Sequence, residues 1–125
     1  MRYVIEQGYT AYYTRIIELL SDLYFAEVDG MLPRLLKRFV KVDVLVIDDF
    51  LLNTTTEHEQ KYLMEVFELR SRDKTLILAS QMSTAEWHKK LGGGAIADAI
   101  LDRAISNSYH VFIGGDSLRQ QSGSN

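Results

Sequence analysis

Two adjacent acids, Asp48 and Asp49, follow four apolar residues in the stretch VLVIDDF. Such a run is typical of a buried parallel strand, and in open α/β sheets ligands bind at the edge where these strands end. One carboxylate there supplies the hard oxygen ligand that Mg²⁺ on a triphosphate requires, and a second polarises the attacking water. Asp48 is the candidate metal ligand and Asp49 the candidate water-activating group. The alternative is that one aspartate caps the turn and the other is solvated.

Polar residues also follow the next apolar run, TLILA, which ends at Ala79 and is followed by Ser80 and Gln81. On a strand beside the acid pair, a small polar side chain is placed to contact a γ-phosphate or the water. The more common role of such a pair is to begin a turn. The value of Ser80 therefore depends on its position relative to Asp48.

A third group of charges lies in ADAILDR, where Asp98, Asp102 and Arg103 interrupt an apolar pattern. Spacing alone favours an amphipathic helix whose charges pair locally or face water. An arginine that reaches the phosphates of a neighbouring subunit would instead neutralise charge in the transition state.

The elements that position these residues are short strands alternating with helices. Apolar residues recur at helical spacing after TAYYT, which predicts a strand over 10–14 followed by a helix. Thr54 to Thr56 before EHEQ resembles a capped helix start. The predicted helices are 16–28, 32–40, 54–70, 84–90 and 96–105, and the predicted strands are 10–14, 42–47, 75–79 and 109–113. Alternation of this kind predicts an α/β fold with a mostly parallel sheet and right-handed crossovers.

The two ends of the chain carry further signals. YVIEQ before Gly8 reads as the last turns of a helix with glycine just past its end. The tail QQSGSN is expected to be disordered. One domain over residues 1–119 and a tail over 120–125 follow from the absence of a linker or an internal repeat.

Composition restricts the class of protein. The chain has 125 residues, a formal net charge of −3 and no cysteine. No run of about 18 apolar residues is present, so no membrane partner is expected. Without cysteine the chain suits a reducing cytoplasm. The small negative charge argues against a protein coated with positive charge for nucleic acid, although it allows a local basic face.

Taken together, five stretches resemble one family. VDVLVIDDF, TLILASQ, WHKKLGG, AIADAILDR and GDSLRQ occur in the order and spacing of the IstB-like ATPases. These are transposition helper proteins related to the DnaC-like helicase loaders, within the AAA+ class of P-loop ATPases. The resemblance extends from about Gly8 to Arg119 and implies a three-layer P-loop NTPase fold acting in DNA transposition or replication.

The resemblance also implies roles for individual residues. Asp48 matches the Walker B magnesium ligand, and Asp49 matches the acid that activates water. Ser80 falls at the polar sensor of the adjacent strand. Arg103 matches the arginine finger offered to the next subunit, and Arg119 the second sensor arginine that reads the nucleotide.

Partners follow from the same resemblance. In the family, the helices before the Walker B strand face DNA in the assembled oligomer, which makes Arg34, Lys37 and Arg38 candidate phosphate contacts. For three basic residues, a solvated helix face is the more common explanation. The implied partners are further copies or intact AAA+ subunits, DNA, and a transposase or replicative helicase.

One part of the family pattern is missing from the sequence. The phosphate-binding loop G-x-x-x-x-G-K-[ST] occurs nowhere in the chain, and Gly92 to Gly94 are not followed by Lys and Ser or Thr. The chain is therefore expected to begin midway through the P-loop helix and to lack the central P-loop strand. The strands over 75–79 and 109–113 then flank a gap, which leaves three outcomes: they pair with each other, a partner fills the space, or the fold is marginal.

The missing loop also bears on activity. Its backbone amides and lysine would hold the β- and γ-phosphates, so this chain alone is expected to bind Mg²⁺-ATP weakly or not at all. Whether it is an enzyme stays open. A second hypothesis is a non-catalytic module that keeps the oligomer surface, including Arg103, and regulates intact relatives. A receiver-like magnesium phosphoacceptor ranks third, because TLILAS ends in serine and YHVFIGG has no lysine.

Overall fold

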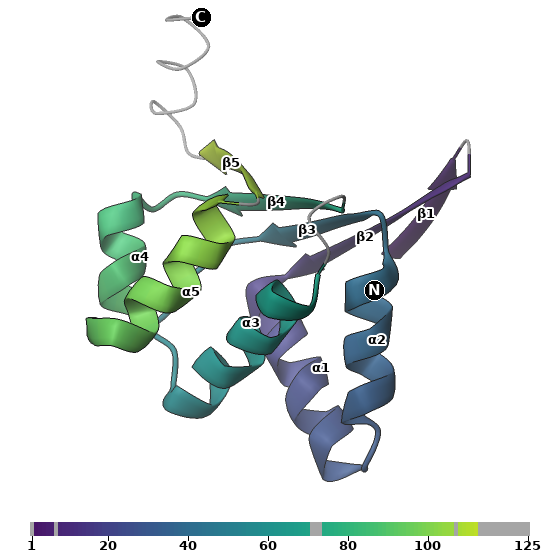
Figure 1. Cartoon of the computed structure of the whole chain (residues 1–125), viewed down its shortest axis with the longest axis horizontal. Coiled ribbons are helices and arrows are strands. Elements are labelled where there is room, and N and C mark those ends of the chain that lie inside the picture. Colours follow the sequence, from purple (N-terminus) through teal and green to yellow (C-terminus); the bar gives the residue numbers. More distant parts are fainter. Residues whose placement is uncertain (1, 7, 71–73, 107, 113–125) are drawn as a thin grey trace, which may run out of the picture.

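In the part of the chain that the structure describes, five strands form one sheet, in the order β1-β2-β3-β4-β5, and five helices cover one of its faces (Figure 1). The computed structural model describes residues 2–6, 8–70, 74–106 and 108–112. The strands are β1 (Arg2–Glu6), β2 (Tyr9–Arg15), β3 (Val44–Asp48), β4 (Thr75–Ser80) and β5 (Ser108–Phe112). The helices are α1 (Ile16–Val28), α2 (Leu32–Lys41), α3 (Glu57–Leu69), α4 (Thr84–Lys90) and α5 (Gly94–Ser106).

Four of the strands are parallel and follow one another across the sheet in chain order. β2 pairs with β3, β3 with β4 and β4 with β5, all in parallel. Right-handed crossovers between strands that advance in one direction place every connecting helix on the same face. Figure 1 shows this arrangement, with helices α1 to α5 on one side of the sheet.

Burial along the strands follows the same division. Leu45 and Ile47 of β3 point into the helical layer and are fully buried, whereas Val44 and Val46 on the opposite face are only half-buried. The described residues thus supply a sheet and one helical layer, which are two of the three layers of a P-loop NTPase. The fold is α/β, a partial P-loop NTPase fold with a mostly parallel sheet, as the sequence predicts. None of the described helices is both long and apolar enough to cross a membrane.

The prediction that YVIEQ ends a helix at Gly8 is wrong. The segment Arg2–Glu6 is strand β1, antiparallel to β2, with Glu6 opposite Tyr9. Gly8 has a φ of 85°, the left-handed conformation that glycine also supplies in tight hairpin turns. Consecutive Tyr, Val and Ile favour a strand by their aromatic and β-branched side chains, and pairing with β2 outweighs the helix-end signal. The expectation that the chain begins within the P-loop helix is wrong for the same reason.

The strands expected to flank a gap pair directly with each other. β4 and β5 form a continuous parallel ladder from Leu76 opposite Ser108 to Ser80 opposite Phe112. Of the three outcomes considered, closure between these two strands is therefore the one observed.

The helix predictions are confirmed with small shifts at the ends. Thr56 caps α3, because its hydroxyl accepts from the amide of Glu59 while the Glu59 carboxylate accepts from the amide of Thr56. A second capping box, formed by Ser83 and Glu86, begins α4. Arg119 and the tail over 120–125 lie outside the described residues.

Asp43 ties three strands together at the edge opposite the acid pair. Its carboxylate accepts from the Thr10 amide at 2.8 Å and from Lys74 Nζ at 3.0 Å, and its carbonyl accepts from the Thr75 amide at 2.8 Å. The Thr10 amide and the Lys74 ammonium lower the pKa of this carboxyl below its usual value. The carboxylate form is thus favoured in the folded state.

Asp43→Asn is accordingly expected to change the acid dependence of stability. A depressed folded pKa contributes stability that is present above the ordinary aspartate pKa of about 3.9 and is lost as pH falls through the folded value. The difference in unfolding free energy between the two proteins should therefore be largest near neutral pH and shrink below about pH 4. Urea unfolding of the two proteins near neutral pH and below about pH 4 measures this difference in free energy. A difference that is the same at both pH values would exclude a stabilising role for the Asp43 carboxylate.

Candidate functional site

Asp48 is the last residue of β3 and lies at the carboxyl edge of the parallel sheet. Both of its carboxylate oxygens accept hydrogen bonds from its own chain. Oδ1 accepts from the Asp49 amide at 2.8 Å, and Oδ2 accepts from the hydroxyl of Tyr13. The hydrogen bond to Asp48 is the main cause of a raised pKa for Tyr13, so the hydroxyl keeps its proton and holds this carboxylate in place.

Asp49 is paired with an arginine from the neighbouring strand. Nε and Nη2 of Arg15 donate to one carboxylate oxygen of Asp49 at 3.1 and 2.8 Å. Parallel pairing makes this possible, because Arg15 at the end of β2 lies opposite Asp48. The bond to Asp49 raises the pKa of Arg15 further, and the ion pair is solvent-accessible, with 53% and 25% of the two side chains exposed. Exposed pairs of this kind stabilise a fold little, so Arg15 remains free to exchange partners.

The loop after β3 turns sharply and is fastened to β4. Asp49 and Leu51 both have positive φ, 55° and 57°, a conformation that aspartate tolerates better than leucine. The amide of Phe50, between them, donates to the carbonyl of Ala79 at 2.9 Å, and the Phe50 ring is fully buried. This anchor fixes the backbone that carries the acid pair.

Ser80, the predicted sensor residue, is buried beside this loop. Its hydroxyl donates to the Phe50 carbonyl at 2.9 Å and accepts from the Met82 amide and from Trp87 Nε1, both at 3.0 Å. One proton and two lone pairs are all that a hydroxyl offers, and all are used. The side chain therefore couples β4 to the acid-bearing loop, and a contact with a phosphate would require one of these bonds to be exchanged.

Arg103 lies on α5 and is bound within its own chain. Its Nη2 pairs with Glu68 of α3 at 2.8 Å, and its Nη1 donates to the Ala99 carbonyl at 3.2 Å. Both α3 and α5 run from the carboxyl edge of the sheet back toward the other edge. Arg103 and Glu68 lie near the ends of these helices, so the structure does not bring Arg103 to the acid pair of its own chain.

The candidate DNA-contacting residues share one surface. Arg34, Lys37 and Arg38 are exposed on the outer face of α2, and Lys41 continues the same face one turn later. No described acidic side chain forms a recorded ion pair with any of them. These cations are available to a partner.

The acid pair could hold Mg²⁺, but the sequence contains no loop that would hold the triphosphate. A magnesium ion in a nucleotide site takes one or two carboxylates and completes its shell with water and phosphate oxygens, and Asp48 supplies such an oxygen at an accessible edge. Among the described residues, no three His, Asp or Glu side chains gather in a way that could hold a metal ion. The ion would thus need the nucleotide, and the chain has no glycine loop that holds one.

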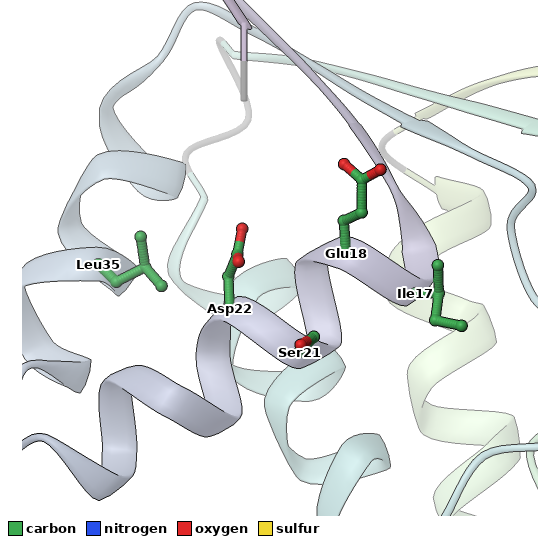
Figure 2. Close-up of a pocket in the computed structure, with 5 residues that line it drawn as sticks. All are labelled: Ile17, Glu18, Ser21, Asp22 and Leu35. Atoms are coloured by element: carbon green, nitrogen blue, oxygen red, sulfur yellow. The ribbon is translucent and has the colours of Figure 1, made fainter.

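Two hollows in the described surface are not lined by either member of the acid pair. One of about 680 Å³ is lined by Ile17, Glu18, Ser21 and Asp22 of α1 together with Leu35 of α2. Figure 2 shows the Glu18 and Asp22 carboxylates on one side of α1. No third described ligand joins these two acids, so they do not by themselves indicate a metal site.

A family model supports the resemblance noted in the sequence. The model described as IstB-like ATP binding protein matches residues 2–125. The chain belongs to this family. The relatives that the IstB-like chain matches are ATP-binding proteins of insertion sequences.

Three relatives illustrate the match. The insertion sequence ATP-binding protein y4pL of Sinorhizobium fredii is 34% identical over 108 residues, which are 86% of the IstB-like chain and 44% of the relative. A second protein of the same organism, y4uH, is 33% identical over 90% of the chain and 46% of its own length. The IS5376 ATP-binding protein of Geobacillus stearothermophilus is 32% identical over 92% of the chain and 46% of its own length. The IstB-like chain thus spans less than half the length of these relatives.

Two contacts of the candidate site in the IstB-like chain are not predicted from its sequence. The roles of Tyr13 and Arg15 depend on β2 lying beside β3 in parallel register, which no local pattern reveals. One signal in the sequence could have indicated them. Residues two apart on a strand share a face of the sheet, so Tyr13 and Arg15 are expected to point to the same side.

Proposed function

We propose that this chain is the acid-bearing part of an ATP-hydrolysing module that assists DNA transposition. The observation that carries the proposal is the Asp48–Asp49 pair at the carboxyl end of β3, held by Tyr13 and Arg15. In this proposal β3 is a Walker B strand. Ser80 and Arg119 are its two sensors, and Arg103 serves the site of another subunit.

The chemistry follows from the positions of the two acids. Mg²⁺, when bound with ATP, neutralises charge on the phosphate oxygens. Asp48 would hold it directly or through water, and its bond from Tyr13 fixes the carboxylate orientation, as outer-shell hydrogen bonds do for metal ligands. Arg15 donates only to Oδ2 of Asp49, so Oδ1 of the same carboxylate would polarise the attacking water while Arg15 holds the group in place.

DNA and protein partners belong to the same proposal. Arg34, Lys37 and Arg38 would contact DNA phosphates, which gives affinity without sequence preference. A transposase, or a replicative helicase as for the helicase loaders, would be the protein served. A cytoplasmic location stays a prediction.

One feature favours a second function. The sequence has no G-x-x-x-x-G-K-[ST], so a chain acting alone lacks the groups that cradle the phosphates. As a non-catalytic module it would bind intact AAA+ relatives and change their ATPase rate, with Arg103 contributing to the contact. Mixing with such a relative, with and without Arg103→Ala, distinguishes the two functions.

Titration of the purified chain with labelled ATP and Mg²⁺ tests the expected weakness of the isolated site. Without the glycine loop, we expect a Kd of about 1 mM or weaker, which corresponds to only about 4 kcal/mol of binding free energy. Equilibrium dialysis measures it, with Asp48→Asn as the control for metal-dependent binding. Binding in the micromolar range would contradict the account of the site.

A further inference from the structure

α1 ends in large apolar side chains that nothing in the described chain covers. Tyr24, Phe25 and Val28 are 52%, 60% and 65% exposed, and the two rings form an edge-on pair with centroids 5.6 Å apart. We call these three residues the α1 knob. Exposed large apolar side chains that lie next to one another often mark interaction surfaces.

A complementary hollow lies elsewhere on the same molecule. The space between α2 and α3, about 500 Å³, has apolar walls formed by Leu32, Pro33, Leu36, Val40 and Leu69. We call it the α2–α3 groove. Leu69 is 54% exposed, so the groove is open to solvent. Its volume and apolar lining suit one or two aromatic side chains.

The charges around the two surfaces also match. Asp22 on α1 and Asp29, the residue that follows the helix as its C-cap, lie three and four residues from Phe25, so acids border the knob. Lys37 lines the groove on the α2 side, next to the exposed Arg34 and Arg38, whereas Glu65 lines it on the α3 side. An acid-bordered knob therefore fits the groove in the orientation that turns its aspartates toward α2.

We propose that the α1 knob of one copy of this chain docks in the α2–α3 groove of a second copy. The knob and the groove are different surfaces, so the contact is heterologous: two copies exchange knobs in a closed pair, or successive copies form an open chain. The contact surface is small, which places it among weak interfaces with a Kd of about 10 µM to 1 mM. It is separate from Arg103 and from the acid pair, and does not depend on ATP.

Sedimentation velocity of the chain over that concentration range tests the proposal. The average mass should rise with concentration, and Phe25→Asp or Leu69→Asp should each weaken association at least about tenfold, because each places a charge in an apolar contact. Ile17→Asp is the matched control, since Ile17 is 61% exposed at the other end of the same helix. It should associate like the unmodified chain. Phe25→Ser and Leu69→Ser serve if an aspartate variant fails to fold.

Mixing the two variants gives the sharpest result. Phe25→Asp keeps its groove and Leu69→Asp keeps its knob, so the mixture should form a one-to-one pair although each variant alone is monomeric. A chain that stays monomeric throughout, or a mixture that does not pair, would overturn the proposal. DNA is the competing occupant: if the chain is monomeric and Phe25→Asp abolishes retention of duplex DNA, the knob is a nucleic-acid surface instead.

Discussion

Replacement of Asp49 by asparagine is expected to slow ATP hydrolysis by about 10²- to 10⁴-fold, the range that a positioned general base contributes. The suitable protein is a hybrid of y4pL in which this chain replaces the matching segment, because y4pL supplies the rest of a full-length relative. Asparagine keeps the size of Asp49 but cannot take up a proton. Its neutral amide can still accept a hydrogen bond from Arg15 but loses the charge attraction of the carboxylate. Steady-state phosphate release by the hybrid measures the effect.

The comparison needs two controls. Unmodified y4pL establishes the activity that the hybrid should approach. Asp29→Asn removes an exposed carboxylate just past the end of α1, at the opposite end of this helix from Arg15, and should leave the rate unchanged. If Asp49→Asn and Asp29→Asn have equal rates, Asp49 is not the water-activating group.

Trp87→Ala is expected to lower the free energy of unfolding of the chain itself by about 3 to 5 kcal/mol. Trp87 is almost fully buried, meets the Phe50 ring edge-on with centroids 4.9 Å apart, and donates from Nε1 to Ser80. Alanine leaves a cavity under the acid-bearing loop and removes this hydrogen bond. Urea unfolding followed by circular dichroism measures the loss.

Ser80→Ala provides the graded comparison. It leaves the Trp87 indole, the Met82 amide and the Phe50 carbonyl without their shared partner, at a cost of about 1 to 3 kcal/mol. If Ser80→Ala is neutral and Trp87→Ala costs less than about 1 kcal/mol, the region is not a structural support for the loop.

Most of the fold can be predicted because its signals are local. Helical spacing of apolar residues locates α1 and α2, and the continuous apolar runs locate β3 and β4. The capping signal over Thr54 to Thr56 places the start of α3 within three residues of its observed start at Glu57. The segment before Gly8 is the exception. A glycine after an apolar stretch fits both a helix end and a hairpin turn, and only the pairing of β1 with β2 decides between them.

The site is less predictable because its contacts cross between strands. The types of Asp48 and Asp49 and their place after an apolar run suffice to nominate them. That Tyr13 and Arg15 hold them depends on the register between β2 and β3, and that Ser80 is fully hydrogen-bonded depends on the packing of Trp87. Arg103 and Glu68 are 35 residues apart in the chain and lie on different helices. Their ion pair therefore depends on how α3 and α5 pack, which no local pattern reveals.

The central claim is that Asp48 is the metal-facing acid of a nucleotide site. Its most direct test is the Mg²⁺ dependence of ATP binding by the y4pL hybrid, measured by calorimetry with and without Asp48→Asn. If Asp48 holds the ion, Mg²⁺ should strengthen ATP binding by the unmodified hybrid at least about tenfold and have little effect on the variant, because the variant lacks this carboxylate. Equal Mg²⁺ dependence in the two proteins would contradict it.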